Sequence, residues 1–291
     1  MPNKLTLLDS ISRNGSAQKP NEDAFGFHDH AAFVIDGATC LGDNIVTGEI
    51  GSDAAWLAEF CRVHFLEMLA DDETTKEIIA KTNALVGHLI SYLTAKDQPP
   101  AWQLPVASFQ MLRLVDNQLV SYGLGDCVAY VEGAENTVQT ISPMGDHGAE
   151  EMSRAREAIL RAGGLNTETS LLDDKPLLEI ERALRGTYNT PGGPLWTLGT
   201  APDAAHHIHE QPAPTENGTI ALICTDGFSA LVDKYQRYTP ANLLQKAKAD
   251  GLQALADELR HIEQVEDPDG HHYPRLKASD DATAVLVRIG G

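Results

Sequence analysis

Two Asp-Gly pairs in this sequence each follow a short apolar run. Ala31–Gly37 (AAFVIDG) ends in Asp36-Gly37, and Thr219–Gly227 (TIALICTDG) ends in Asp226-Gly227. A carboxylate at the end of a buried strand, followed by a glycine whose backbone can approach an ion closely, can hold a hard cation. One Asp-Gly pair alone is also an ordinary turn. Because the construction recurs, the two strand ends could share one site.

Two further acidic pairs also lie beside apolar runs. Asp280-Asp281 precedes Thr283–Ile289, and Glu22-Asp23 stands before Phe25 and Phe27. Four acidic strand ends that are far apart in sequence indicate a convergent carboxylate cluster. Crowded carboxylates repel one another and raise one another's pKa unless cations neutralise them, so the expected occupant is Mg²⁺ or Mn²⁺.

The elements that would position these carboxylates follow from hydrophobic periodicity. Apolar residues recur at three- and four-residue spacing in Asp43–Leu69 and Glu73–Leu93, which predicts two long helices. Pro240–Ala249 and Leu252–Ile262 are expected as closing helices, followed by a polar loop over Glu263–Leu276. Strands are expected at Leu5–Ile11, Ala24–His28, Val106–Val115, Leu119–Gly123 and Val128–Val131, with Asp116-Asn117 as a hairpin turn.

Five short motifs together resemble those of a known protein family. NEDAFGF, FVIDGA, SYGLGDCVAYV, ALICTDGFSAL and SDDATAVLV occur in the order and approximate spacing of the metal-dependent Ser/Thr protein phosphatases, the type 2C or PPM family, in its bacterial-type form. The resemblance spans Leu5 to Ile289. It implies an α+β fold, a four-layer αββα sandwich in which two mainly antiparallel sheets are flanked by helices. We expect residues 1–291 to form a single domain of this kind.

The resemblance also implies roles for the acidic residues. Asp36 would bridge two metal ions, while Asp226 and Asp280 would each complete a metal shell, and these three form the catalytic set. Gly37 would contribute its carbonyl oxygen, and Glu22 and Asp23 would act largely through bound waters. Asp126 of the Gly125-Asp126 pair would help to bind a third ion, although it could instead simply turn a hairpin. The implied cofactors are two or three Mn²⁺ or Mg²⁺ ions, with metal-activated water as the nucleophile.

Two positions depart from the family pattern. A phosphate-gripping arginine precedes the position of Asn21 by three residues in the family, and here that position is Gln18. Lys19 or Arg13 could take over phosphate binding, as could Arg185, but lysine lacks the bidentate fork of arginine. Ala38-Thr39-Cys40 also replaces a turn that carries a histidine in some members.

The stretch of about 141–218 occupies the place of the family's variable flap. It contains helical patterns at Glu150–Ala162 and Leu177–Leu184, and the insertion Leu171–Pro194 is unusual for the family. Thr190–Pro194 (TPGGP) is expected as a loop or hinge. The alternating histidines His206, His207 and His209 have no companion ligand pattern for zinc, so we expect them on a surface or strand face.

Composition limits the remaining classes of function. Asp and Glu number 42 against 22 Lys and Arg, a formal charge of −20, which disfavours binding to nucleic acid or an anionic membrane. Met1–Ser10 does not resemble a signal peptide, and no apolar run approaches the roughly 20 residues that span a bilayer. The cysteines lack CxxC spacing and are expected to be reduced. We therefore expect a cytoplasmic, monomeric protein.

The leading hypothesis is a metal-dependent phosphomonoesterase, specifically a Ser/Thr protein phosphatase whose partner is a phosphoprotein. A phosphatase of a small phosphorylated metabolite would use the same chemistry. A non-catalytic pseudo-phosphatase that binds partners is the other alternative, motivated by Gln18. Serine-based hydrolysis is disfavoured because the sequence has no GxSxG elbow, and a nuclease because there is no basic stripe.

Overall fold

Two five-stranded antiparallel sheets form the centre of the protein. The computed structural model describes residues 4–144, 148–165, 171 and 174–290. The first sheet has the order β1-β10-β9-β6-β7, with β1 Leu5–Arg13, β10 Ala282–Ile289, β9 Ile220–Cys224, β6 Val128–Glu132 and β7 Val138–Ile141. The second has the order β2-β3-β4-β5-β8, with β2 Asp23–His28, β3 Ala31–Gly37, β4 Ala107–Val115, β5 Gln118–Leu124 and β8 His209–Pro212.

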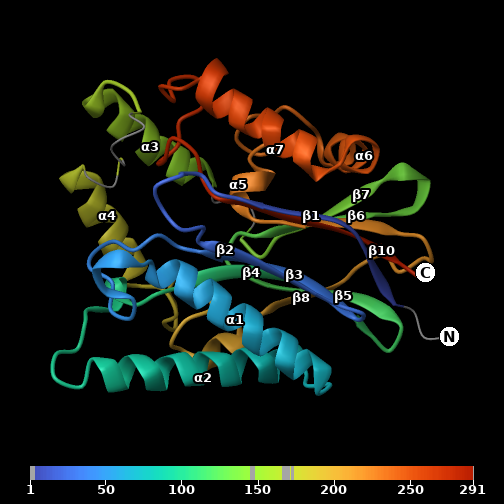
Figure 1. Ribbon diagram of the computed structural model, residues 1–291, viewed down its shortest axis with the longest axis horizontal. Coiled ribbons are helices and arrows are strands. Elements are labelled where there is room, and N and C mark those ends of the chain that lie inside the picture. The colour runs from blue at the N-terminus through green and yellow to red at the C-terminus, as the bar shows by residue number, and fades with distance from the viewer. Residues whose placement is uncertain (1–3, 145–147, 166–170, 172–173, 291) are drawn as a thin grey trace.

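Helices cover the outer face of each sheet. α1 (Asp53–Ala70) and α2 (Thr75–Leu93) lie on the second sheet, whereas α6 (Pro240–Asp250) and α7 (Leu252–His261) lie on the first (Figure 1). Separate apolar clusters fill the space under each helix pair and between the sheets. The expected four-layer αββα sandwich is thereby confirmed.

β3 shows how the sequence pattern builds these layers. Its apolar run is continuous rather than alternating, because both faces of the strand are covered. Ala32 and Val34 pack between the two sheets, whereas Phe33 and Ile35 pack against the layer of α1 and α2. Packing on both faces fixes the position of the strand. Its last two residues, Asp36 and Gly37, therefore have a fixed position at the end of the apolar run.

The first helix begins ten residues later than the sequence pattern predicted. The expected helix Asp43–Leu69 starts at Asp53, with Ser52 as its N-cap. The carboxylate of the fully buried Asp53 accepts backbone N–H bonds from Ile45 at 2.5 Å and Thr47 at 2.9 Å. An aspartate that binds preceding amides favours a loop over a helix, so the residues before Ser52 fold into a loop with a short 3₁₀ turn, Gly48–Ile50.

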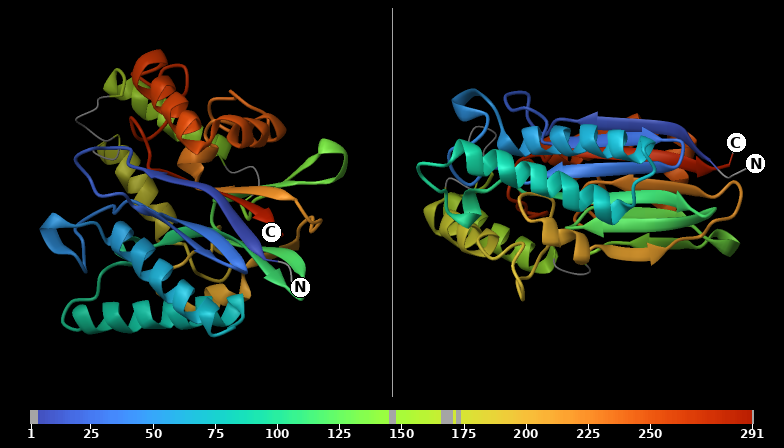
Figure 2. Two further views of the ribbon diagram at one scale, coloured as in Figure 1. Left: turned by 45° about the vertical axis from the view of Figure 1, so that its right-hand side comes forward. Right: turned by 90° about the horizontal axis from the view of Figure 1, so that it is seen from below.

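The two ends of the chain lie side by side, and the acidic strand ends lie at the opposite end of the sandwich. Leu5 pairs with Ile289 near the termini, and Arg13 pairs with Ala282 at the other end of the same two strands (Figure 2). β2 starts and β3 finishes at that second end, since Asp23 is the cross-strand partner of Asp36. Strand direction therefore brings the acidic residues of both sheets to one edge.

The stretch between β7 and β8 lies beyond this edge. α3 (Gly148–Ala162) and α4 (Lys175–Arg185) share a small apolar cluster of their own that includes Ile159, Leu165 and Leu177. Both are drawn beyond the strand ends in Figure 1. Part of the insertion Leu171–Pro194, residues 172–173, lies outside the described residues. The remaining short helices are Ala101–Gln103, Ala134–Asn136, Pro202–His206 and Asp226–Ser229, the last being α5.

The polar segment after α7 corrects another expectation. Residues 263–276 were expected to form a loop, but Ile262–Glu266 continues α7 as a turn of π-helix. Arg260 and Glu263 stabilise this turn through a buried ion pair of 2.6 Å. Among the described residues, no helix combines the length and apolar character needed to cross a membrane.

Candidate active site

Aspartates from both sheets line one cavity of about 230 Å³ at this edge. Asp36 is the sixth residue of β3, Asp226 opens α5 two residues after β9, and Asp280 lies two residues before β10. Asp126 also lines the cavity. The structure therefore brings together the three residues predicted to be catalytic.

Asp23 and Asp36 are paired across β2 and β3. Burial raises the pKa of Asp36 well above its ordinary value, and the charges of Asp23 and Asp226 raise it further. The pKa of Asp23 is also raised, first by burial and then by Asp281, although the Thr225 hydroxyl donates a 2.9 Å hydrogen bond to its carboxylate. A cation at this position would relieve the repulsion among these side chains.

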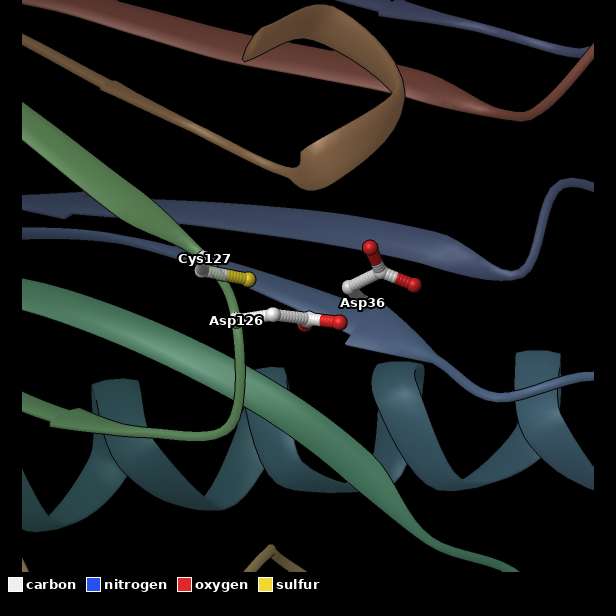
Figure 3. Close-up of side chains that lie close together, drawn as sticks. All are labelled: Asp36, Asp126 and Cys127. Carbon is white, nitrogen blue, oxygen red and sulfur yellow. The ribbon is translucent and has the colours of Figure 1, made fainter. Parts of the chain in front are cut away.

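Asp126 lies where the chain crosses from one sheet to the other. It was considered as a simple hairpin residue, but β5 and β6 belong to different sheets, so this interpretation is wrong. The preceding Gly125 has a φ of +83°, a conformation that favours glycine and allows the abrupt crossing. The Asp126 carboxylate and Cys127 thiol point toward Asp36 (Figure 3), and the potential ligand atoms of these three residues lie within 4.8 Å of one another.

The two glycines that follow Asp36 and Asp226 are required by close backbone contacts. A Cβ at Gly37 would lie 2.6 Å from the carbonyl oxygen of Glu22, and a Cβ at Gly227 would lie 1.9 Å from that of Asp281. Neither position tolerates a side chain without backbone movement. The Asp-Gly pairs therefore serve to bring neighbouring strand ends together, in addition to any contact with an ion.

Glu22 has a different environment from the aspartates. It is 8% exposed, and its carboxylate accepts hydrogen bonds from the hydroxyls of Ser52, at 2.6 Å, and Thr39. Neither Glu22 nor Asp23 is among the residues that line the cavity. Glu22 thus ties the N-terminus of α1 and the loop after β3 to the strand ends, which is compatible with the indirect, water-mediated role expected for it.

Asp281 is a positioning residue that the sequence did not single out. Its carboxylate accepts backbone N–H bonds from Gly15 at 2.7 Å and from Glu22 at 2.6 Å. Burial raises its pKa, and these two hydrogen bonds oppose that increase. Asp281 therefore fixes the segment that delivers Glu22 and Asp23.

Two lysines beside the aspartates were also missed. Lys277 Nζ lies 2.6 Å from Asp280 Oδ1, and Lys234 Nζ lies 3.7 Å from Asp226 Oδ2. Burial opposes ionisation of Asp280, but the two ammonium groups outweigh it and hold the Asp280 pKa below its ordinary value. The only sequence signal was a lysine three residues before Asp280, directly after the expected polar loop Glu263–Leu276.

Of the four candidates for phosphate binding, only Arg185 lines the cavity, and the other three lie elsewhere. Gln18 and Lys19 are exposed, and Arg13 forms an exposed ion pair with Asp257. None of the three lines the cavity, whereas Arg154 and Arg185 of the insertion do. Residues from α3 and α4 therefore supply the arginines on the wall facing the strand ends.

The histidines and cysteines take ordinary positions. His206 and His207 are exposed, as expected, and His207 stacks on Trp196 with a ring separation of 3.8 Å. His209 is half-buried in β8. Three of the cysteines are fully buried, Cys61, Cys127 and Cys224, and Cys40 is half-buried.

The donor set fits a hard divalent cation. Four aspartate carboxylates line the cavity, and the backbone of Gly37 joins them. Oxygen ligands suit Mg²⁺ and Mn²⁺ rather than softer ions, and the nearby Cys127 thiol does not line the cavity. With the Arg154–Glu181 ion pair counted as neutral, four aspartates face two cations, Arg185 and Lys277, so the described cavity wall has an excess of negative charge.

Several solved structures have a fold similar to that of this chain. The Mycobacterium tuberculosis serine/threonine phosphatase PstP/Ppp matches with a TM-score of 0.57 and 14% identity, over 99% of this chain and 100% of that chain. The PPM Ser-Thr phosphatase MsPP from Mycobacterium smegmatis matches with a TM-score of 0.54 and 15% identity, over 98% and 100%. PppA, a regulatory component of T6SS in Pseudomonas aeruginosa, matches with a TM-score of 0.54 and 17% identity, over 99% and 98%.

No protein-family model and no curated protein matches the sequence. The structural matches establish the fold: the chain has the αββα sandwich of the PPM Ser/Thr phosphatases, over nearly its full length.

Proposed function

We propose that this protein is a metal-dependent phosphomonoesterase, specifically a Ser/Thr phosphoprotein phosphatase. The observation that carries the proposal is the convergence of Asp36, Asp126, Asp226 and Asp280, from both sheets, on one cavity. A structure of the PstP catalytic domain, which shares the fold with a TM-score of 0.56, holds two manganese ions. We propose two or three Mn²⁺ or Mg²⁺ ions for this chain.

Each acidic residue has a proposed task that follows from its position. Asp36, paired with Asp23 and central among the carboxylates, would bridge two ions, while Asp226 and Asp280 would each hold one side. Asp126 would bind a further ion, and Glu22 would orient ligands while held by Ser52. When bound, such ions supply a nucleophile by lowering the pKa of water and stabilise the charge of the phosphoryl group.

The chain's own contribution is to hold these oxygens in place before substrate arrives. Asp36 stands at the end of a strand buried on both faces, and the Gly37 N–H donates a 3.0 Å hydrogen bond to the Glu22 carbonyl. Thr225 similarly holds Asp23. Ligands supported by rigid elements and neighbouring hydrogen bonds keep a site in productive geometry.

Hydrolysis of an aryl phosphate tests the proposal. The purified full chain should release phosphate with Mn²⁺ or Mg²⁺, lose activity on chelation and regain it when the ion is restored. Thiol alkylation should leave the activity intact, because Cys127 and Cys224 are fully buried and burial raises the pKa of both thiols. Turnover that survives thorough metal removal would overturn the proposal.

The same assay separates the alternatives. Phosphopeptides and small phosphorylated metabolites should be compared at equal concentration with each ion. Preference for metabolites would identify a small-molecule phosphatase. Absence of turnover on every substrate, together with metal binding by calorimetry, would identify a non-catalytic binding protein.

The remaining assignments belong to the same proposal. We infer a single domain over residues 1–291, with an insertion at about 141–218, since β1 from one end of the chain pairs with β10 from the other. A cytoplasmic, bacterial, monomeric protein is proposed with it. The four free cysteines and the bacterial source of the similar structures support location and origin.

A further inference from the structure

Three cations among the described residues line the cavity, Arg154, Arg185 and Lys277, and their surroundings differ. Arg154 Nε lies 2.8 Å from Glu181 Oε1, so a carboxylate neutralises its charge. Lys277 is similarly held by Asp280 at 2.6 Å. Arg185 forms no ion pair with any described carboxylate. Its Nη1 donates a hydrogen bond to the carbonyl oxygen of Thr39 at 2.6 Å. Among the described lining residues, Arg185 is thus the cation whose charge has no carboxylate partner.

Burial makes this arrangement unfavourable without an anion. The Arg185 side chain is half-buried, and its partial removal from solvent lowers its pKa from the ordinary arginine value. A partly buried charge without a partner is unfavourable, and a bound anion would relieve that penalty. A guanidinium keeps several N–H donors free after one bond to a carbonyl, in a planar arrangement that fits phosphate.

The Thr39 contact also fixes where the charge is held. Thr39 is three residues beyond Asp36, and both line the cavity. Arg185 is therefore anchored beside the carboxylates that would hold the metal ions. Gln18, at the position where the resemblance implies a phosphate-binding arginine, is exposed and does not line the cavity.

We propose that Arg185, from α4, is the residue that binds the substrate phosphate in this protein. This inference rests on the proposed phosphatase function. The guanidinium would donate to non-bridging phosphoryl oxygens while Thr39 holds it in place. Recognition then comes from the insertion rather than from the loop between β1 and β2.

α4 provides a matched control one turn earlier. Arg182 donates two hydrogen bonds to the carbonyl oxygen of Leu41, at 2.8 and 2.5 Å, and its guanidinium lies 4.2 Å from the centre of the Trp102 ring. It therefore attaches α4 to the same loop but does not line the cavity. Substitution of Arg182 weakens the attachment of α4 only. Substitution of Arg185 weakens the same attachment and also removes the proposed phosphate-binding group.

The experiment compares Arg185→Gln, Arg185→Lys and Arg182→Gln in the Mn²⁺-loaded full chain. Measurements are kcat and KM for an aryl phosphate, the Kd of inorganic phosphate by calorimetry, and Tm. Arg185→Gln should raise KM and phosphate Kd by about ten- to a hundredfold, the range expected for a charge-assisted bidentate contact. Arg185→Lys should fall in between, because it keeps charge without the fork. Arg182→Gln should lower Tm but leave KM and Kd within about twofold of wild type.

Four outcomes test the role of Arg185 separately from the proposed function. Wild-type KM and Kd in Arg185→Gln would overturn the assignment, as would equal increases in Arg182→Gln. If the wild type shows no turnover, the proposed function fails, yet phosphate binding that depends on Arg185 still supports the assignment. If the wild type also binds no phosphate, the assignment fails with it.

Discussion

The Asp281 carboxylate accepts the backbone N–H of Glu22 at 2.6 Å, although the two residues are 259 positions apart. The same carboxylate accepts the N–H of Gly15 at 2.7 Å. A side chain at the start of the last strand therefore fixes the loop between the first two. Neither hydrogen bond could be predicted from local sequence, because each depends on β1 and β10 being neighbours in one sheet.

Asp281→Ala should destabilise the protein by about 2 kcal/mol, because two backbone donors lose a charged acceptor. Relief of repulsion with Asp280 makes the loss smaller than the two bonds alone would suggest. Urea unfolding of the metal-free protein measures it. Asp281→Asn is the control, since its amide oxygen can still accept one bond and should restore part of the stability. An alanine variant as stable as wild type would contradict this role.

Asp36→Asn should lose most turnover while the fold remains intact. Replacing the central carboxylate removes a charge that a divalent cation would share, so Mn²⁺ affinity measured by calorimetry should fall as well. Without metal the variant should be as stable as wild type or more stable, because like-charge repulsion is relieved. Unfolding of the metal-free variant at ordinary temperature would show instead that Asp36 is needed for the structure.

The stability difference should also depend on pH. The pKa of Asp36 is raised in the folded state, so the folded protein holds this proton more tightly than the unfolded chain. The resulting stabilisation is complete below the unfolded pKa and is lost as pH rises through the folded value. Between about pH 4.5 and pH 8, the free energy of unfolding of metal-free Asp36→Asn should therefore rise relative to that of the wild type. The expected rise is roughly 1.4 kcal/mol for each unit by which folding raises the Asp36 pKa. A difference that is equal at both pH values would contradict the environment described for Asp36.

Lys277→Met should strengthen metal binding and lower the stability of the metal-free protein. The ammonium beside Asp280 repels a bound cation and competes for the Asp280 carboxylate. Two unit charges about 4 Å apart interact by about 1 kcal/mol in water, so loss of Lys277 should raise Mn²⁺ affinity by at least several-fold. Without metal, Asp280 would lose the ammonium that holds its pKa low. Calorimetry and thermal unfolding test the two effects, and Lys277→Arg, which keeps the charge, is the control. Weaker Mn²⁺ binding in Lys277→Met would mean that Lys277 helps to shape the site.

Gln18→Arg should leave KM for an aryl phosphate within about twofold of wild type, because position 18 is exposed and does not line the cavity. Steady-state kinetics at saturating Mn²⁺ test this. A large fall in KM would show that the loop between β1 and β2 reaches the substrate after all.

Most strands and helices could be predicted from the sequence because their signals are local, whereas the sandwich that they form was implied by the resemblance to the type 2C phosphatases. Continuous apolar runs mark strands buried on both faces, as in Ala31–Gly37, and the acidic pairs mark where such runs stop. Helix boundaries were less predictable. Asp53 appeared to continue a helical pattern, but its carboxylate is committed to the amides of residues 45–47, and only the folded loop shows this.

The places of the cavity's cations could not be predicted in the same way, although Arg185 was one of the candidates for phosphate binding. Arg185 lies 149 positions from Asp36, and its place depends on how α4 sits against the loop after β3. Lys277 carried no motif, because a lysine in a polar segment is ordinary until its partner Asp280 is known. Charged residues that come together only through tertiary packing produce no periodic pattern in the sequence.

The floor and the wall of the cavity have separate structural supports. Strand ends of the two sheets hold the aspartates, whereas α3 and α4 pack on a small core of their own. Two arginines of α4 donate hydrogen bonds to carbonyl oxygens of the loop after β3. Substitutions on the cavity side of α4 can therefore accumulate without disturbing the carboxylates. Under the proposed function, this division would allow phosphate recognition on α4 to change while the carboxylates of the strand ends stay in place.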